Sequence, residues 1–195
     1  MFPGPAGTAV REWLARFPGT TETRKDSYLL RPRLPGLSVK LRGGSSLDVK
    51  SCLGSPGILG LPRGGCGRLE SWRKWSFPCA PPGRDDAPPD GWGIVRKRRR
   101  RTWFPLAAGH DTARAVLPAV QAGCAVELTQ VRIRSEPWWS VGFEATGSAS
   151  LLRCALDHAA DLVFATPPPD GIELSLDNSR SYAQWLSLPE VGFRR

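Results

Sequence analysis

Lysine and arginine side chains recur at alternate positions in several separate segments of the chain. Lys40 and Arg42 alternate in LSVKLR, and Lys97, Arg99 and Arg101 alternate in GIVRKRRRRTWF. In a β-strand, residues two positions apart point to the same face, so this spacing gathers the cations of each segment on one side. Cations gathered from several strands would bind a polyanion such as a phosphate chain through charge-assisted hydrogen bonds.

A few carboxylates follow the same alternation. The candidate cations are Lys40, Arg42, Lys50, Arg68, Lys74, Lys97, Arg99 and Arg101, and the candidate carboxylates are Glu12, Glu70, Glu127 and Glu144. A lumen of cations alone would repel itself, and a bound triphosphate would neutralise it with the help of a divalent ion held by carboxylate oxygens. We therefore expect the bases to serve phosphate and the acids to serve metal.

The segments that carry these residues are predicted to be short strands separated by turns. Strands are expected at residues 9–17, 26–30, 37–42, 46–51, 67–77, 93–104, 124–133 and 138–145, and the 19 Pro and 21 Gly punctuate them. Residues 78–91 are expected to form a Pro-rich loop. Helices are predicted at 111–121, where Pro118 interrupts, at 151–163, with Ser148 and Ser150 as N-caps, and at 179–188.

These elements predict an α+β fold that is mainly β. About eight antiparallel strands are enough to form a closed or nearly closed tunnel barrel that holds one ligand, with the C-terminal helices packed outside. Length favours a single domain over residues 1–195, strand-rich from 9 to 147 and helical from 148 to 190. Trp72, Trp75, Trp138 and Trp139 are interpreted as core or rim packing rather than as platforms for bases.

Composition limits the classes of function. The 41% hydrophobic content excludes a disordered basic tail, and the net charge of +9 favours anionic partners such as phosphates, nucleic acid or anionic lipid. No run of 18 apolar residues occurs and the N-terminus has no leader pattern, so we expect no secretion signal, no membrane span and no membrane partner. The five cysteines lack C-x-x-C spacing, which argues against zinc or a disulfide framework and favours a cytoplasmic location.

The order of the motifs resembles the CYTH superfamily, the triphosphate tunnel metalloenzymes. The matching segments are EWLAR at 12–16, DSYL at 26–29, VKLR at 39–42, LDVK at 47–50, the VRKRRR strand, VELTQV at 126–131 and FEATG at 143–147. The opening E-x-E-x-K signature of the family serves metal with its glutamates and phosphate with its lysine. Here Glu12, Leu14 and Arg16 occupy those positions, so one carboxylate is lost and one base replaces another.

The resemblance implies roles for individual residues. It implies phosphate contacts for Lys40, Arg42, Lys50, Lys97 and Arg99, to which Arg16, Lys74 and Arg101 are added as further candidate bases. It implies that Glu12, Glu127 and Glu144 hold Mg²⁺ or Mn²⁺. Neither His110 nor His158 belongs to this set, and no residue is identified as a catalytic base.

The predicted function is binding of a triphosphate or another polyphosphate inside a basic β-tunnel. If the protein is an enzyme, the resemblance implies metal-dependent hydrolysis of a triphosphate rather than adenylate cyclase activity. Two alternatives stay open: a nucleic-acid-binding domain that uses the basic run 96–101 and exposed tryptophans, and a non-catalytic ligand-binding or regulatory module. The tunnel prediction places Lys97, Arg99 and Arg101 inward and Arg96, Arg98 and Arg100 outward. The nucleic-acid alternative makes the whole run a surface patch.

Overall fold

The chain folds around one antiparallel sheet of eight strands. A computed structural model describes residues 1–30, 33–79, 90–106, 122–189 and 191. The strands are β1 (Phe2–Pro3), β2 (Thr20–Leu29), β3 (Leu37–Arg42), β4 (Ser46–Gly60), β5 (Cys66–Pro78), β6 (Trp92–Pro105), β7 (Gly123–Ile133) and β8 (Glu136–Thr146), and the helices are α1 (Thr8–Ala15), α2 (Leu152–Phe164) and α3 (Tyr182–Leu186). The predicted mainly-β, antiparallel class is confirmed.

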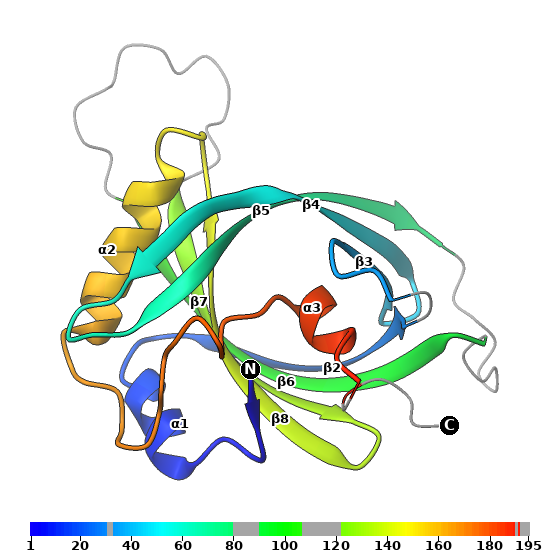
Figure 1. The fold of residues 1–195 in the computed structure, drawn as a ribbon, viewed down its shortest axis with the longest axis horizontal. Helices are drawn as coiled ribbons and strands as arrows, with labels where there is room; N and C mark the ends of the chain where they lie inside the picture. Colours follow the sequence, from blue (N-terminus) through cyan, green and yellow to red (C-terminus); the bar gives the residue numbers. More distant parts are fainter. Residues whose placement is uncertain (31–32, 80–89, 107–121, 190, 192–195) are drawn as a thin grey trace.

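The sheet curls into an open half-barrel with a concave and a convex face (Figure 1). The strand order is β1-β8-β7-β6-β2-β3-β4-β5, so β1 and β5 form its two edges. No backbone pairing joins these edges within the described residues, so the closed form of the predicted barrel is not present. Lys50 of β4 nevertheless reaches across to β8, where its Nζ lies 3.6 Å from Glu144 Oε1.

The long β4–β5 hairpin bends toward α2. Its register shifts between Cys52 and Gly54 and again between Gly54 and Gly57, and such bulges bend a strand and increase its twist. Gly54 and Gly57 have φ angles of 135° and 126°, which side-chain-bearing residues rarely adopt. Beyond the bulges, Arg153 of α2 donates a hydrogen bond to the carbonyl of Ile58 at 3.3 Å. The bend therefore brings one end of the edge hairpin to the helix.

Helix α2 packs outside the half-barrel, as predicted. Its buried residues, including Ala159 and Val163, pack with Val126 and Leu128, which alternate with the inward-facing residues of β7. The predicted caps are wrong, because the N-cap is Leu151 and no side chain caps the helix. Ser148 and Ser150 instead lie 3.1 Å apart, hydroxyl to hydroxyl. None of the described helices has the length and apolarity required to cross a bilayer.

The predicted strand at 9–17 is wrong, because residues 8–15 form α1. Val10, Trp13 and Leu14 are its buried residues, at the i, i+3, i+4 spacing of a helix face. Val10 and Leu14 are four residues apart, a spacing that puts them on one face of a strand or of a helix. Trp13 packs on Phe164 of α2, with 5.4 Å between the ring centroids, and this contact favours the helix. Eight strands are still present because the short β1 was not predicted, and β2 begins six residues earlier than expected.

Helix α3 lies on the concave face rather than outside the barrel, which corrects the prediction for the C-terminal helices (Figure 1). A capping box fixes its start, since Ser181 Oγ accepts from the backbone of Gln184 and the Gln184 side chain accepts from the backbone of Ser181. Trp185, fully buried, packs with Val95 and Val131. At this end of the barrel the inward residues are apolar, so an apolar helix face is buried there.

Several expectations concern residues that are not described. These are the predicted helix at 111–121, His110, and residues 80–89 of the predicted loop. The five cysteines are free in the structure.

Candidate anion-binding site on the concave face

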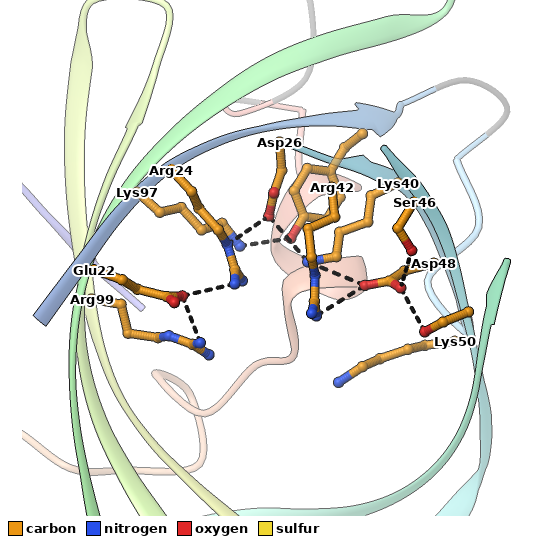
Figure 2. Close-up of polar contacts among 12 residues, drawn as sticks. Glu22, Arg24, Asp26, Lys40, Arg42, Ser46, Asp48, Lys50, Lys97 and Arg99 are labelled. Atoms are coloured by element: carbon orange, nitrogen blue, oxygen red, sulfur yellow. Dashed lines mark hydrogen bonds and ion pairs between the residues drawn. The ribbon is translucent and has the colours of Figure 1, made fainter. Parts of the chain in front are cut away.

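Charged side chains from seven strands converge on the concave face. Figure 2 shows residues that take part in the polar contacts of this face, and those labelled, from Glu22 to Arg99, point toward one another inside the curve of the sheet. Paired residues on neighbouring strands share a face, and the register places Arg24 opposite Lys97, Glu22 opposite Arg99, and Lys40 opposite Asp48. A charge pattern that begins on β2 is thereby continued on β3, β4 and β6.

Two fully buried carboxylates, Asp26 and Asp48, anchor the centre of this face. Asp26 Oδ2 lies 3.0 Å from Lys40 Nζ and 3.2 Å from Arg24 Nε. Lys40 Nζ also lies 3.9 Å from Asp48 Oδ2, so a single ammonium group links the two acids. A buried charge is tolerated only when it is paired and hydrogen-bonded, and this linkage supplies the pairing.

Asp48 gathers polar groups from three strands. Arg42 Nη2 and Lys74 Nζ lie 2.9 and 3.3 Å from Oδ2, and Ser76 Oγ donates to Oδ1 at 2.7 Å. Ser46 Oγ donates to the same oxygen at 3.4 Å. Burial acts to raise the pKa of Asp48, but the Ser76 hydrogen bond and the two cations outweigh it and hold the pKa below its ordinary value. Asp48 is therefore ionised at neutral pH and fixes the heads of two cations.

A second ionic cluster lies along β2, β6 and β7. Arg99 donates to Glu22 at 2.6 Å and to Glu127 at 2.9 Å, and Arg101 Nε lies 3.3 Å from Glu127. Burial acts to lower the pKa of Arg99, but Glu127 and Glu22 raise it above its ordinary value. Glu22 also contacts Arg24 at 2.8 Å, which connects this cluster to Asp26.

Lys97 marks the boundary between the charged part of the concave face and the part covered by α3. Its Nζ donates to Tyr28 Oη at 2.6 Å and lies 3.5 Å from the ring centroid of Tyr182. Burial, aided by the nearby Lys40 charge, lowers the pKa of Lys97 well below its ordinary value. Burial likewise lowers the pKa of Lys40, to about 8. Two ammonium groups are thus held in positions where their charge is costly.

Cations outnumber carboxylates on this face. The cations are Arg24, Lys40, Arg42, Lys50, Lys74, Lys97, Arg99 and Arg101, and the carboxylates that they contact are Glu22, Asp26, Asp48, Glu127 and Glu144. The side chains of Arg42, Lys50, Lys74 and Arg101 keep 35 to 42% of their surface exposed. In addition, the buried Nε atoms of Arg42 and Arg99 have no hydrogen-bond partner within the described residues. An incoming oxyanion would pair with the exposed cations.

Most of the predicted site residues are brought together here. Lys40, Arg42, Lys50, Lys74, Lys97, Arg99, Arg101, Glu127 and Glu144 all belong to the concave set. Glu12 and Arg16 do not, because residue 12 is on α1 and residue 16 caps it. Arg16 donates instead to the backbone carbonyls of Trp13 and Val163, joining α1 to α2.

Two further candidates have contacts of other kinds. Glu70 accepts from Trp72 Nε1 at 2.9 Å and from Gln184 Nε2 at 2.7 Å, so it joins β5 to α3. Arg68 is exposed, and its backbone N–H donates to Ser179 Oγ. Both residues help to dock the segment around α3 onto the edge strand.

Sequence reasoning missed four members of the site: Glu22, Arg24, Asp26 and Asp48. The signal for the first three was present, since TETRKDSYL places them at alternate positions, and Asp26 is the first residue of the predicted strand at 26–30. Extending that strand toward its N-terminus would have added Glu22 and Arg24. Asp48 shares the parity of Lys50 in the predicted strand at 46–51, which places it on the charged face, but it was not among the candidate site residues.

The described carboxylates do not form a metal site by themselves. No group of three or more His, Cys, Asp or Glu side chains with metal-binding geometry occurs in the described part of the chain. Glu127 is held by Arg99 and Arg101, and Glu144 lies next to Lys50. Oxygen ligands that are already paired with cations do not suit a resident Mg²⁺ or Mn²⁺ ion, so no step is derived through one.

Comparisons with protein-family models, with curated proteins and with solved structures found no match to this chain. The fold and the concave cluster of charges are therefore the basis of the functional argument.

Proposed function

We propose that the concave face binds a triphosphate or another polyphosphate compound. The observation that carries the proposal is the excess of converging cations over carboxylates, of which Arg42, Lys50, Lys74 and Arg101 remain partly exposed. A chain of phosphoryl groups presents several negative charges at short intervals and matches cations supplied by separate strands. Arg42 and Arg101 suit this task because a guanidinium binds phosphate oxygens with a planar pair of donors.

The carboxylates of the site would position cations rather than bind the ligand. Asp48 holds Arg42 and Lys74, and Glu127 holds Arg99 and Arg101. A cation that is fixed before the ligand arrives loses less conformational entropy on binding. The resemblance to the triphosphate tunnel enzymes adds support from the motif order, without Glu12 and Arg16. We further propose that the tunnel form arises by closer approach of β4 and β8, where Lys50 already contacts Glu144.

Hydrolysis is the activity that the resemblance adds to binding. It would proceed by attack of water on a terminal phosphoryl group, with cations stabilising the charge that develops on its oxygens. Mg²⁺ or Mn²⁺ would then arrive with the phosphate ligand, since Glu127 and Glu144 are paired with cations in the structure. The proposal of binding is independent of turnover, and a non-catalytic module would bind without releasing phosphate.

Calorimetric titration of the purified chain with inorganic triphosphate tests the proposal, with ATP and thiamine triphosphate as further ligands. The informative variant is Lys50→Ser with Arg101→Ser, because Glu144 is 53% exposed and Glu127 keeps Arg99, so no buried acid loses its last partner. Charged hydrogen bonds contribute roughly 1.5–3 kcal/mol each, so we expect the affinity for triphosphate to fall about 100-fold or more.

The matched control is Arg96→Ser with Arg98→Ser, which removes the same charge from the opposite face of the sheet. This control should bind triphosphate within about twofold of the wild type after correction for net charge. Equal loss in both double variants, or no binding by the wild type, would overturn the proposal. Parallel assays for phosphate release, with and without Mg²⁺ or Mn²⁺, decide between an enzyme and a binding module.

A further inference from the structure

A tryptophan follows the cations of β6 on the concave face. Trp103 lies two residues after Arg101 and four after Arg99, so its side chain shares the face of these cations. Val95, near the start of the same strand, also points to this face and packs with α3. The concave side of β6 therefore runs from an end covered by α3, through the cations, to Trp103.

The backbone of β7 supports the ring of Trp103. A Cβ added at Gly123 would lie 2.5 Å from Cζ2 and 3.0 Å from Cε2 of the ring, so glycine leaves the room that the ring occupies. Ala125, which pairs directly with Trp103, is fully buried. Small residues thus lie beneath the ring, and 37% of Trp103 is still exposed.

Trp103 has no aromatic partner among the described residues. Ring pairs are formed by four other tryptophans: Trp13, Trp138, Trp139 and Trp185. Trp103 forms none of the aromatic pairs in the described part of the chain, and it belongs to neither hydrophobic cluster there. A ring that stacked on its exposed side would bury apolar surface and gain the added attraction of an aromatic pair.

A carboxylate lies in the same cross-strand row as this ring. Trp103 pairs with Ala125, which pairs with Glu144, so Glu144 is two strand spacings, or about 10 Å, from Trp103. The Glu144 side chain is 53% exposed and forms an ion pair with Lys50 at 3.6 Å. An ionised carboxylate accepts hydrogen bonds from hydroxyl or amino groups and repels phosphate. This row therefore suits the organic part of a ligand, whereas the cations that precede it on β6 suit the phosphates.

We propose that the polyphosphate bound on the concave face is an ester of an aromatic compound, as in a nucleoside triphosphate, and that its ring stacks on Trp103. This inference rests on the proposed binding of phosphates by the concave cations. Arg101 lies about 7 Å from Trp103 along β6, which leaves room for the linker between an aromatic ring and its first phosphate. The phosphates extend toward Arg99, and the ring stays at the end of the strand away from α3. Inorganic triphosphate would use the same cations and leave Trp103 uncovered.

Calorimetric titration of the full chain with ATP, thiamine triphosphate and inorganic triphosphate tests the inference. Trp103→Leu keeps an apolar side chain over Gly123 but removes the ring, and it should weaken binding of the aromatic ligand by about fivefold or more, the effect of losing one stacked base. Its affinity for inorganic triphosphate should be unchanged, which also shows that the variant is folded. Trp103→Phe keeps a ring and should retain most of the affinity that Trp103→Leu loses. A loss for ATP identifies a nucleoside, and a loss for thiamine triphosphate alone identifies a cationic ring.

The matched control is Trp75→Leu, which removes an exposed tryptophan from the convex face. Trp75 alternates with Lys74 on β5 and is 42% exposed, although it was expected to pack. Trp75→Leu should leave all three affinities unchanged. Equal effects of Trp103→Leu on the three ligands, or equal effects of the two leucine variants, would overturn the inference and leave the phosphate proposal in place. If the wild type does not bind inorganic triphosphate, the proposed function fails, and this inference fails with it.

Discussion

The basic residues from Arg96 to Arg101 are consecutive in sequence but lie in two different environments. On the concave face, Arg99 contacts two carboxylates, Arg101 contacts one, and Lys97 lies against two tyrosine rings. On the convex face, Arg96 and Arg98 are exposed without ion pairs to described residues. Curvature explains the difference, because side chains converge inside a curled sheet and diverge outside it.

Arg100 shows what an outward position needs in order to gain partners. Its guanidinium donates to the carbonyl of Phe17 at 2.5 Å and to that of Ala15 at 3.4 Å, at the end of α1. An outward cation is thus partnered where a helix covers the sheet. Arg96 and Arg98 have no such cover within the described residues, which is why the two faces are expected to respond differently to the same substitution.

The largest expected effect is loss of an anchor of the concave face. Asp48→Asn keeps the shape of the side chain but leaves Arg42, Lys74 and Lys40 facing a neutral amide. Breaking a buried ionic network from one side typically costs about 3 kcal/mol or more of unfolding free energy, which urea denaturation would measure.

The control for this prediction is the same substitution in an exposed ion pair. Asp157 pairs with Arg153 one turn apart on the surface of α2, so Asp157→Asn should change the unfolding free energy by about 0.5 kcal/mol or less. Similar values for the two variants would mean that water screens the concave charges and that the ion pairs of this face stabilise the fold no more than exposed ones do.

A smaller effect is expected from the paired variants Arg99→Ser and Arg98→Ser. Arg99→Ser leaves Glu22 with Arg24 and Glu127 with Arg101, so each acid keeps one partner, and the loss should be about 1.5 kcal/mol. Arg98 contacts no described acid, and Arg98→Ser should stay within about 0.5 kcal/mol of the wild type. Thermal unfolding followed by circular dichroism measures both, and a larger loss for Arg98→Ser would reverse the assignment of the faces.

Period-two alternation predicted the strands that carry the site because it is a local property of each segment. It placed LSVKLR, SLDVKS and GIVRKRRRRTWF correctly and split the basic run between the two faces as expected. It failed at residues 9–17, where a helix face and a strand face share Val10 and Leu14, and packing on α2 decided between them.

The partners of the charges could not be predicted from alternation. Which acid contacts which base depends on the strand order. In that order β2 lies between β3 and β6, and not beside β1, the strand that precedes it in sequence. The concave position of α3 was equally hidden, since the apolar inner residues Val95, Val131 and Ile133 come from strands that are otherwise rich in charge or distant from the helix in sequence. Long-range register, which the sequence does not display, determines both.

The last effect expected is a pH dependence of stability that belongs to the concave face. The pKa of Lys40 is lowered from 10.5 to about 8 by burial, so between these values the unfolded chain binds more protons than the folded one. The free energy of unfolding should therefore rise as the pH increases from 8 toward 10, by about 2 kcal/mol, and the gain should be lost as the pH falls back through 8. The lowered pKa of Lys97 acts in the same direction. Lys40→Arg keeps a cation beside Asp26 that does not titrate in this range, so urea denaturation at pH 7.5 and 9.5 should show a shallower rise in that variant. An equal rise in both proteins would assign the effect to groups other than Lys40.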